Sequence, residues 1–257
     1  MDYQTIATEL LEAETNRRPV EPLTGRYPGL TPDKAYQIQL AGIKTKLAAG
    51  RRVIGKKIGL TSRGMQQLLG VNEPDYGHLL DNMLLLEGEP CQREELLWPR
   101  VEGELVFILK ETIKGPGVTI ADVFRATSGI MPAFEIVDSR IRDWKIKLPD
   151  TIADNASSAR LVLGSRMLPI NDLDLRLIGM VLEKNGEMVS SGAGAAVLGH
   201  PAAAVAWLAN RLAAFDIALE AGEIVLSGAV TAAEDAQAGD VFTVSFCGLG
   251  SLNLKFV

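Results

Sequence analysis

Hydrophobic residues in the first part of the chain recur with the spacing of amphipathic helices. This spacing predicts helices over residues 3–17 and 31–49. Thr31 followed by Pro32 is a typical helix start, because threonine can cap the first turn and proline is tolerated at its first position. A loop rich in proline and glycine separates the two helices. We therefore expect a small helical segment over residues 1–50.

From residue 51 onward the pattern changes to short apolar runs separated by Gly, Pro, Asn and Asp, which is typical of β-structure. Further helices are predicted over residues 62–69, 119–126 and 201–214. Strands are predicted over residues 52–60, 100–109, 131–138, 160–164, 177–184, 222–228, 241–247 and 251–257. Strands and helices do not alternate regularly, and no repeat is present. We expect an α+β fold, in which the helical segment 1–50 is attached to a mixed β-sheet domain over residues 51–257.

The composition is that of an ordinary globular protein, with 257 residues of which 47% are hydrophobic and 23% charged. A net charge of −6 argues against a nucleic-acid partner, which favours a basic surface. The apolar runs fall short of the ~18–20 residues that a membrane span needs, and the acidic start does not resemble a signal peptide. Cys91 and Cys247 are too few for a disulfide framework. These features predict a cytoplasmic enzyme or binding protein.

The small number of histidines limits the kinds of metal site. The chain has two, His78 and His200, so a zinc site with three histidine ligands is excluded. A metal would have to be held mainly by oxygen atoms, which is the preference of Mg²⁺ and Mn²⁺. We expect both histidines to have structural roles.

Two glutamates stand in the apolar strand predicted over residues 100–109. Glu102 and Glu104 are two positions apart, so they share one face of the strand, and that face continues with Val106 and Ile108. Two carboxylates that enter an apolar environment together are costly unless a positive charge compensates them. A salt bridge to a lysine or arginine would suffice, and so would a bound cation.

A third carboxylate favours the cation. Glu135 lies in a second apolar strand, between Phe134 and Ile136. Three carboxylates that converge on one divalent ion would leave about three octahedral positions for water or a chelating substrate. Asp138 is an alternative third ligand, although it lies on the opposite face of the strand from Glu135.

Other polar segments are candidates for catalytic or binding roles. Lys56 and Lys57 point to opposite faces of their strand, so we expect one at the surface and the other inside, where burial lowers the pKa of an amine. Asp75 follows a proline and is equally consistent with a plain turn. Residues 151–158 form a polar stretch that could cap a helix or bind a ligand. The glycines of residues 190–201 lack the spacing of a dinucleotide loop, so we discount NAD and ATP.

Seven motifs, in this order across nearly the whole chain, together resemble one family. They are "GKKIGLTS", "VNEPDYGHLLDNM", "PRVEGELVFIL", "PAFEIVDSRIRDWKIK", "DTIADNASS", "GAGAAVLGHP" and "GLGSLNLKFV". The family is that of the 2-keto-4-pentenoate hydratases and 4-oxalocrotonate decarboxylases, within the fumarylacetoacetate hydrolase-like superfamily. The resemblance implies a mixed β-roll domain and a site for Mg²⁺ or Mn²⁺. It also implies a 2-hydroxydienoate or 2-oxoenoate substrate from the meta-cleavage of aromatic rings.

The resemblance assigns roles to individual residues. It places the metal carboxylates at Glu102, Glu104 and Glu135, the acid–base lysine at Lys57 and the active-site aspartate at Asp75. It also implies homo-oligomers, often built from pentamers, that pair with a neighbouring pathway enzyme.

Two reactions of this family use the same metal site. In the first, a hydratase adds water to the dienoate to give a 4-hydroxy-2-oxo acid. In the second, a decarboxylase releases CO₂ from 2-oxo-3-hexenedioate. The segment "VDSRIRDWKIK" resembles the hydratases more closely, whereas "GAGAAVLGHP" and "SGAVTAA" lean toward the decarboxylases. We expect a hydratase, with the decarboxylase as the alternative.

Two further readings stay open. A metal-stabilised binding protein would keep the carboxylates, but it would not need Lys57 or Asp75. Hydrolysis of an acyl pyruvate would need a histidine that activates water, and His78 is the candidate nearest to Asp75.

Overall fold

The computed structural model describes residues 1–68 and 70–257. Its helices are α1 (Tyr3–Asn16), α2 (Leu23–Arg26), α3 (Pro32–Ala48), α4 (Arg63–Leu68), α5 (Ile120–Ala126), α6 (Leu148–Ala153) and α7 (Pro201–Leu212). Its strands are β1 (Val53–Gly59), β2 (Asp75–Leu80), β3 (Leu84–Leu85), β4 (Arg100–Leu109), β5 (Thr127–Val137), β6 (Ser158–Leu163), β7 (Gly179–Lys184), β8 (Glu187–Ala193), β9 (Ile224–Leu226), β10 (Glu234–Asp235), β11 (Val241–Phe246) and β12 (Gly250–Lys255). Within this described part, no helix is long and apolar enough to cross a membrane.

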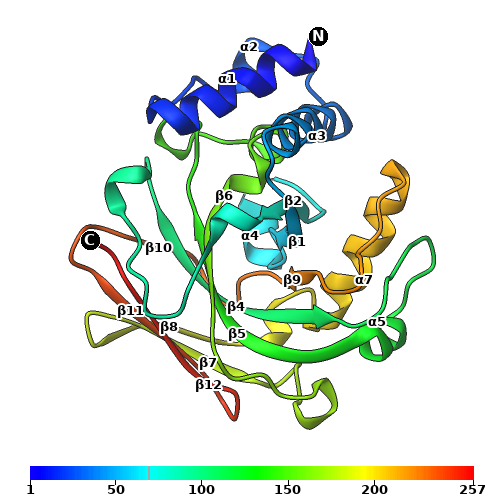
Figure 1. The fold of residues 1–257 in the computed structure, drawn as a ribbon, viewed down its shortest axis with the longest axis vertical. Coiled ribbons are helices and arrows are strands. Elements are labelled where there is room, and N and C mark those ends of the chain that lie inside the picture. Colours follow the sequence, from blue (N-terminus) through cyan, green and yellow to red (C-terminus); the bar gives the residue numbers. More distant parts are fainter. Residues whose placement is uncertain (69) are drawn as a thin grey trace.

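A large mixed sheet forms the centre of the molecule (Figure 1). Its strands run in the order β2-β1-β9-β4-β5-β6-β3, and β10 pairs with β4. The β1–β9 and β3–β6 pairs are parallel, and the other pairs are antiparallel. The long strands β4 and β5 are paired along almost their whole length, which sets the register of the side chains between them.

A second sheet, in the order β12-β11-β7-β8, packs against the large one. Gly103 on β4 lies at this contact, since a Cβ atom there would stand 2.8 Å from Cγ2 of Val244 and 3.3 Å from Cε of Met180. A glycine therefore allows the two sheets to approach closely, and the apolar face of β4 is buried between them.

Helices α1, α2 and α3 gather at the end of the molecule opposite the small sheet (Figure 1). The side chain of Thr31 caps α3, and Pro32 is its first residue, as the sequence predicts. From the buried side of α3, the amide of Gln39 donates hydrogen bonds to the carbonyl oxygens of Tyr76 (2.9 Å) and Ile152 (2.8 Å). The helical segment is thus tied to the backbone of both β2 and α6.

The predicted α+β class is confirmed, and a strand or helix occupies most of each predicted range except residues 222–228, where β9 is only Ile224–Leu226. The predicted helix over residues 62–69 corresponds to α4, and residue 69 lies outside the described residues. Four strands lie outside the predicted ranges: β2, β8 and the two-residue strands β3 and β10. All six residues of β2 are buried, so no alternation is visible, and the residues of β8 are exposed or half-buried. The division into units at residue 50 stays a prediction.

The expectation that one lysine of the pair lies at the surface is wrong. Lys56 and Lys57 are each 3% exposed. They do point to opposite faces of β1, an interior strand between β2 and β9, and their burial shows that both faces of this strand are covered by other parts of the chain. The ammonium group of Lys56 lies 2.5 Å from Oε2 of Glu223, whose side chain is 11% exposed. Lys56 is therefore half of a largely buried ion pair.

This ion pair predicts a stability effect for Lys56→Ala, in place of the nearly wild-type behaviour expected of a surface residue. The substitution leaves the Glu223 carboxylate buried without its partner, which should lower the free energy of unfolding by about 3–5 kcal/mol. Denaturant titration of the purified variant measures the change. A loss below about 0.5 kcal/mol, as is usual for surface substitutions, would contradict a buried pair.

Candidate metal centre

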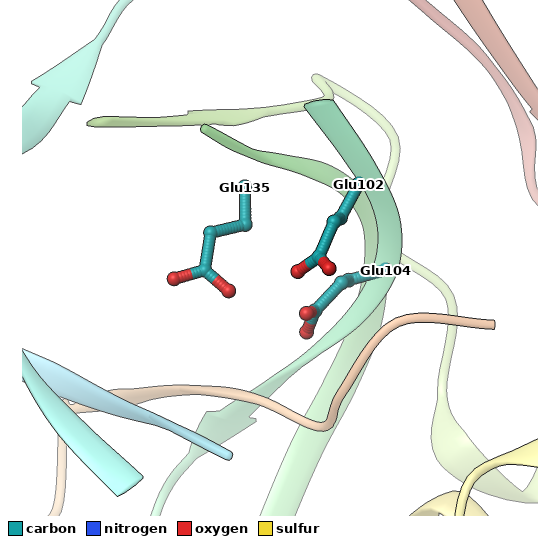
Figure 2. Close-up of side chains that lie close together, drawn as sticks. All are labelled: Glu102, Glu104 and Glu135. Atoms are coloured by element: carbon teal, nitrogen blue, oxygen red, sulfur yellow. The ribbon is translucent and has the colours of Figure 1, made fainter. Parts of the chain in front are cut away.

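Three glutamates from the paired strands β4 and β5 converge at one point (Figure 2). Glu102 lies directly opposite Glu135 in the strand register, and Glu104 is the next residue on the same face of β4. One carboxylate oxygen from each residue lies within 4.8 Å of the other two. Glu104 and Glu135 are fully buried. The sequence-predicted carboxylates are therefore brought together as a single cluster.

Two of these oxygens lack any partner in the described part of the chain. Oε2 of Glu104 accepts a hydrogen bond from the backbone N–H of Gly228 at 2.8 Å, and Oε2 of Glu135 lies 3.2 Å from Nζ of Lys57. The Oε1 atoms of Glu104 and Glu135 have no hydrogen-bond partner. Buried, partnerless carboxylate oxygens that face one another fit a hard divalent cation, whose ligands are such oxygens.

The cluster strongly disfavours its own ionisation in the absence of a cation. Burial raises the pKa of Glu102 to about 7, and the charge of Glu135 adds to the shift. Burial, followed by repulsion from Glu135 and Glu102, also raises the pKa of Glu104 well above its ordinary value. One ammonium group is thus too little positive charge for three carboxylates.

Lys57 lies beside this cluster, but its pKa does not shift in the expected direction. Burial alone would lower the pKa of Lys57, as the sequence predicts. The carboxylates of Glu135, Asp75, Glu102 and Glu104 outweigh burial, and the pKa is raised above its ordinary value. The prediction of a lowered pKa is therefore wrong for this structure, since the surrounding negative charge holds Lys57 in its ammonium form.

Asp75 is the first residue of β2 rather than part of a plain turn. It is 2% exposed, and in the strand register it lies opposite Gly59 of β1. Burial raises the pKa of Asp75, although the charge of Lys57 opposes the shift. The proposed acid–base pair therefore combines a buried ammonium group with a buried carboxyl group.

A cavity of about 530 Å³ opens onto this group of side chains. Lys57, Asp75 and Glu102 belong to its lining. Another part of the lining comes from Trp144, whose ring lies 4.5 Å below the guanidinium group of Arg100. A small organic acid thus has space beside the carboxylates and the acid–base pair.

Other candidate residues have structural contacts instead. Asp138, the alternative third ligand, accepts hydrogen bonds from the backbone N–H groups of Leu97 (2.9 Å) and Trp98 (2.5 Å). Nδ1 of His78 lies 3.0 Å from the side-chain oxygen of Gln39. His200 caps the first turn of α7. These contacts agree with the structural roles expected for the histidines.

Several residues of the cavity were not singled out in the sequence. Arg100 and Trp144 line it, and both lie within motifs that carry the family resemblance, although no role was predicted for either residue. In contrast, the polar composition of residues 151–158 did indicate that this stretch could cap a helix or bind a ligand. Three of its residues, Thr151, Ala156 and Ser157, line the cavity. Residues 190–201 do not contribute to this lining.

Comparison with known proteins gives a consistent result. Residues 79–257 match the family model of the fumarylacetoacetate hydrolase C-terminal region. A 2-hydroxyhexa-2,4-dienoate hydratase from Comamonas testosteroni is 46% identical over 260 residues, which cover 99% of this chain and 98% of the relative. A 2-hydroxypent-2,4-dienoate hydratase from Pseudomonas putida is 51% identical over 214 residues, which cover 83% of this chain and 96% of the relative.

A similar solved structure is that of 4-oxalocrotonate decarboxylase from Pseudomonas putida G7, in complex with magnesium and adipate. It superposes with a TM-score of 0.97 at 38% sequence identity, and the match covers 99% of this chain and 97% of that one. Both reactions named in the sequence analysis thus occur among the proteins that this chain resembles.

The raised pKa of Glu102 predicts how the stability of metal-free protein depends on pH. In the folded state the pKa of Glu102 is about 7, above the ordinary value of 4.5. Between pH 4.5 and pH 7 the folded state therefore binds more protons than the unfolded state. This stabilisation is complete below the unfolded pKa and is lost as the pH rises through the folded one. After chelator treatment, the free energy of unfolding should therefore fall with rising pH mainly between about pH 4.5 and about pH 7, and the last part of this fall lies between about pH 6.5 and about pH 8.

Two controls isolate this effect. Burial lowers the pKa of His78 to about 3 from 6.5, so its opposite contribution changes mainly below the chosen pH window. Glu102→Gln should reduce the pH dependence, because the amide does not titrate while Glu104 still does. Urea titrations at each pH measure both proteins. Equal slopes for the variant and the parent would show that Glu102 does not titrate in this window.

Proposed function

The chain belongs to the fumarylacetoacetate hydrolase family, and within this family we propose that it is a metal-dependent hydratase of 2-hydroxy-2,4-dienoates. One observation carries the proposal: three carboxylates converge, and one of them, Glu102, lines the same cavity as a buried lysine and a buried aspartate. The carboxylates would bind a cation, whereas the lysine and the aspartate would transfer protons. The names of the two hydratase relatives support this reading.

Glu102, Glu104 and Glu135 would hold a divalent cation, for which Mg²⁺ or Mn²⁺ fits the all-oxygen ligands. When bound, the cation would stabilise the negative charge that develops on the 2-oxygen of the substrate. The partnerless Oε1 atoms of Glu104 and Glu135 support this assignment.

The remaining chemistry is proton transfer by this chain's own residues. Lys57 and Asp75 would move the proton of the 2-hydroxyl group to C5, which converts the dienoate into a 2-oxo-3-enoate. Water then adds at C4, and a proton is delivered at C3 to give the 4-hydroxy-2-oxo acid. One oxygen of Asp75 has no hydrogen-bond partner in the described residues, so it is available to accept a proton from the substrate or the water.

Decarboxylation of 2-oxo-3-hexenedioate is the second candidate function. The magnesium complex of 4-oxalocrotonate decarboxylase, with its TM-score of 0.97, favours it. Breaking the bond to the distal carboxylate leaves an electron pair that the conjugated 2-oxo system accepts, so the same three glutamates would serve. The two candidates differ at the far end of the substrate.

The setting of the enzyme follows from the same proposal. We place it in the cytoplasm, in the catabolism of aromatic rings. We also propose that the enzyme forms a homo-oligomer built from pentamers. This assembly would pair with a neighbouring enzyme of the pathway.

An ultraviolet assay tests the proposed function directly. Loss of dienoate absorbance with 2-hydroxypenta-2,4-dienoate, in the presence of Mg²⁺ and without CO₂ release, is expected of the hydratase. CO₂ release from 2-oxo-3-hexenedioate, with little hydration of the dienoate, would assign the decarboxylase instead. Turnover that survives complete chelation would remove the cation from the mechanism.

Glu104→Gln tests the metal site itself. The amide keeps an acceptor for the N–H of Gly228 but removes one negative charge, so affinity for Mg²⁺ and turnover should fall together. The metal-free variant should be as stable as the parent or more stable, because repulsion with Glu102 and Glu135 is relieved. Thermal melts with and without Mg²⁺, beside a metal titration of activity, measure both effects.

Glu223→Gln is the matched control, since Glu223 is the buried partner of Lys56. It should lower the melting temperature and leave the metal dependence of turnover unchanged. If Glu104→Gln behaves in the same way, Glu104 is a structural residue and not a metal ligand.

Lys57→Met tests the acid–base role while retaining most of the buried apolar stem. Turnover should fall on the order of 10²-fold or more, the usual effect of a missing proton-transfer group. Lys56→Met, on the neighbouring position, should lower stability but keep most of the turnover number. The proposed role of Lys57 fails if Lys57→Met retains parental turnover after correction for the folded fraction, or if Lys56→Met loses as much turnover as Lys57→Met.

A further inference from the structure

The two oxygens of the Asp75 carboxyl group have different surroundings. Oδ2 accepts a hydrogen bond from Oγ1 of Thr151 at 3.2 Å. Oδ1 is buried and has no hydrogen-bond partner in the described part of the chain. A Cβ atom on Gly59 would stand 2.2 Å from Oδ1 and 3.2 Å from Nζ of Lys57. The absence of a side chain at Gly59 therefore leaves room for this oxygen beside the lysine.

The hydroxyl group of Thr151 has a second hydrogen-bond partner. Oγ of Ser157 lies 3.4 Å from Oγ1 of Thr151. Since the single hydrogen of Thr151 is directed to Asp75, the hydroxyl of Ser157 must be the donor in this second contact. Thr151 and Ser157 are 5% and 3% exposed, so bulk water does not compete for either hydroxyl group. The contacts form a chain from Ser157 to Thr151 to Asp75.

The segment that carries these hydroxyls has an unusual backbone. Asn155, Ala156 and Ser157 are consecutive and have φ angles of 55°, 50° and 56°. Non-glycine residues in this left-handed region cost of order 1–3 kcal/mol each and persist only where surrounding contacts hold them. Strain of this kind often accompanies a functional site.

Contacts on both sides hold the segment in this conformation. The side chain of Asn155 accepts from the N–H of His78 at 2.8 Å and donates to its carbonyl oxygen at 2.9 Å. Asp154 forms a buried ion pair with Arg140 at 2.5 Å. As a result, the carbonyl oxygen of Ala156 accepts a hydrogen bond from Nζ of Lys57 at 3.2 Å. The strained segment thus contacts Lys57 directly, and it reaches Asp75 through Thr151.

We propose that Thr151 is a positioning residue for proton transfer. Its hydroxyl group, oriented by Ser157, donates a hydrogen bond to Oδ2 of Asp75 and so fixes the orientation of the carboxyl group. In this orientation Oδ1 faces the substrate and is the oxygen that exchanges the proton. The inference rests on the proposed function, because it assigns a partner to the acid–base residue of that same site. Without the hydroxyl, the carboxyl group is free to rotate and its two oxygens become equivalent.

Thr151→Val tests the proposal with a side chain of almost the same shape. The turnover number should fall roughly 10- to 100-fold, as expected when a hydrogen bond to a charged group is lost. The KM and the affinity for Mg²⁺ should change little, because the metal carboxylates are untouched. Thr151→Ser retains the hydroxyl and should recover most of the turnover number. Ser157→Ala should give a smaller loss than Thr151→Val.

A matched control separates positioning from the general cost of placing valine at a buried threonine. Thr127 is 2% exposed, and its hydroxyl donates to the carbonyl oxygen of Val123 at 2.7 Å. Thr127→Val should lower the melting temperature but leave the turnover number unchanged. If Thr151→Val is poorly folded, the comparison of Ser157→Ala with the parent decides the matter.

The outcomes distinguish this inference from the proposed function. A parent enzyme that neither hydrates nor decarboxylates any of the substrates overturns both. An active parent, with Thr151→Val turning over at the parental rate, overturns the positioning role alone. The same holds if Thr151→Ser is as impaired as Thr151→Val, or if the whole effect lies in KM. A loss in the turnover number that serine restores supports the inference.

Discussion

Mutual repulsion among three buried carboxylates is the constraint on which the rest of this structure depends. Glu102, Glu104 and Glu135 approach one another because β4 and β5 pair in a fixed register, and a slip of one residue would turn one set of side chains to the other face. Close packing of the small sheet on β4 keeps that register. The burial that brings the oxygens together also raises the pKa values of Glu102 and Glu104, so the site has a high affinity for positive charge before any substrate arrives.

The second half of the site is built from different parts of the chain. Lys57 and Asp75 come from the neighbouring strands β1 and β2. Thr151 of α6 donates a hydrogen bond to Asp75, and Ala156, between α6 and β6, accepts one from Lys57. Lys57 therefore has two roles in the structure. It offsets part of the negative charge of the glutamates, and it stands next to the one carboxyl oxygen of Asp75 that lacks a partner.

Much of this arrangement could be predicted from the sequence, and the failures have physical reasons. The boundaries of β4 were predicted correctly, so the shared face of Glu102 and Glu104 followed from strand periodicity alone. Periodicity does not reveal which strands are neighbours. For that reason it failed for Lys56, whose face of β1 is covered, and for β2, whose uniform burial leaves no alternation. The raised pKa of Lys57 depends on four carboxyl groups from three other strands, which no local pattern contains.

The point at which the family match begins has a consequence for how such sites can diverge. The shared region starts at residue 79, so it includes all three glutamates, whereas Lys57 and Asp75 precede it. The proposed cation-binding half and the proposed proton-transfer half of the site thus belong to different stretches of the chain. A protein that kept the first stretch and exchanged the second would keep the three carboxylates but could catalyse a different reaction. Agreement over residues 79–257 alone therefore covers only the glutamates, and residues 51–78 have to be compared before an activity is assigned.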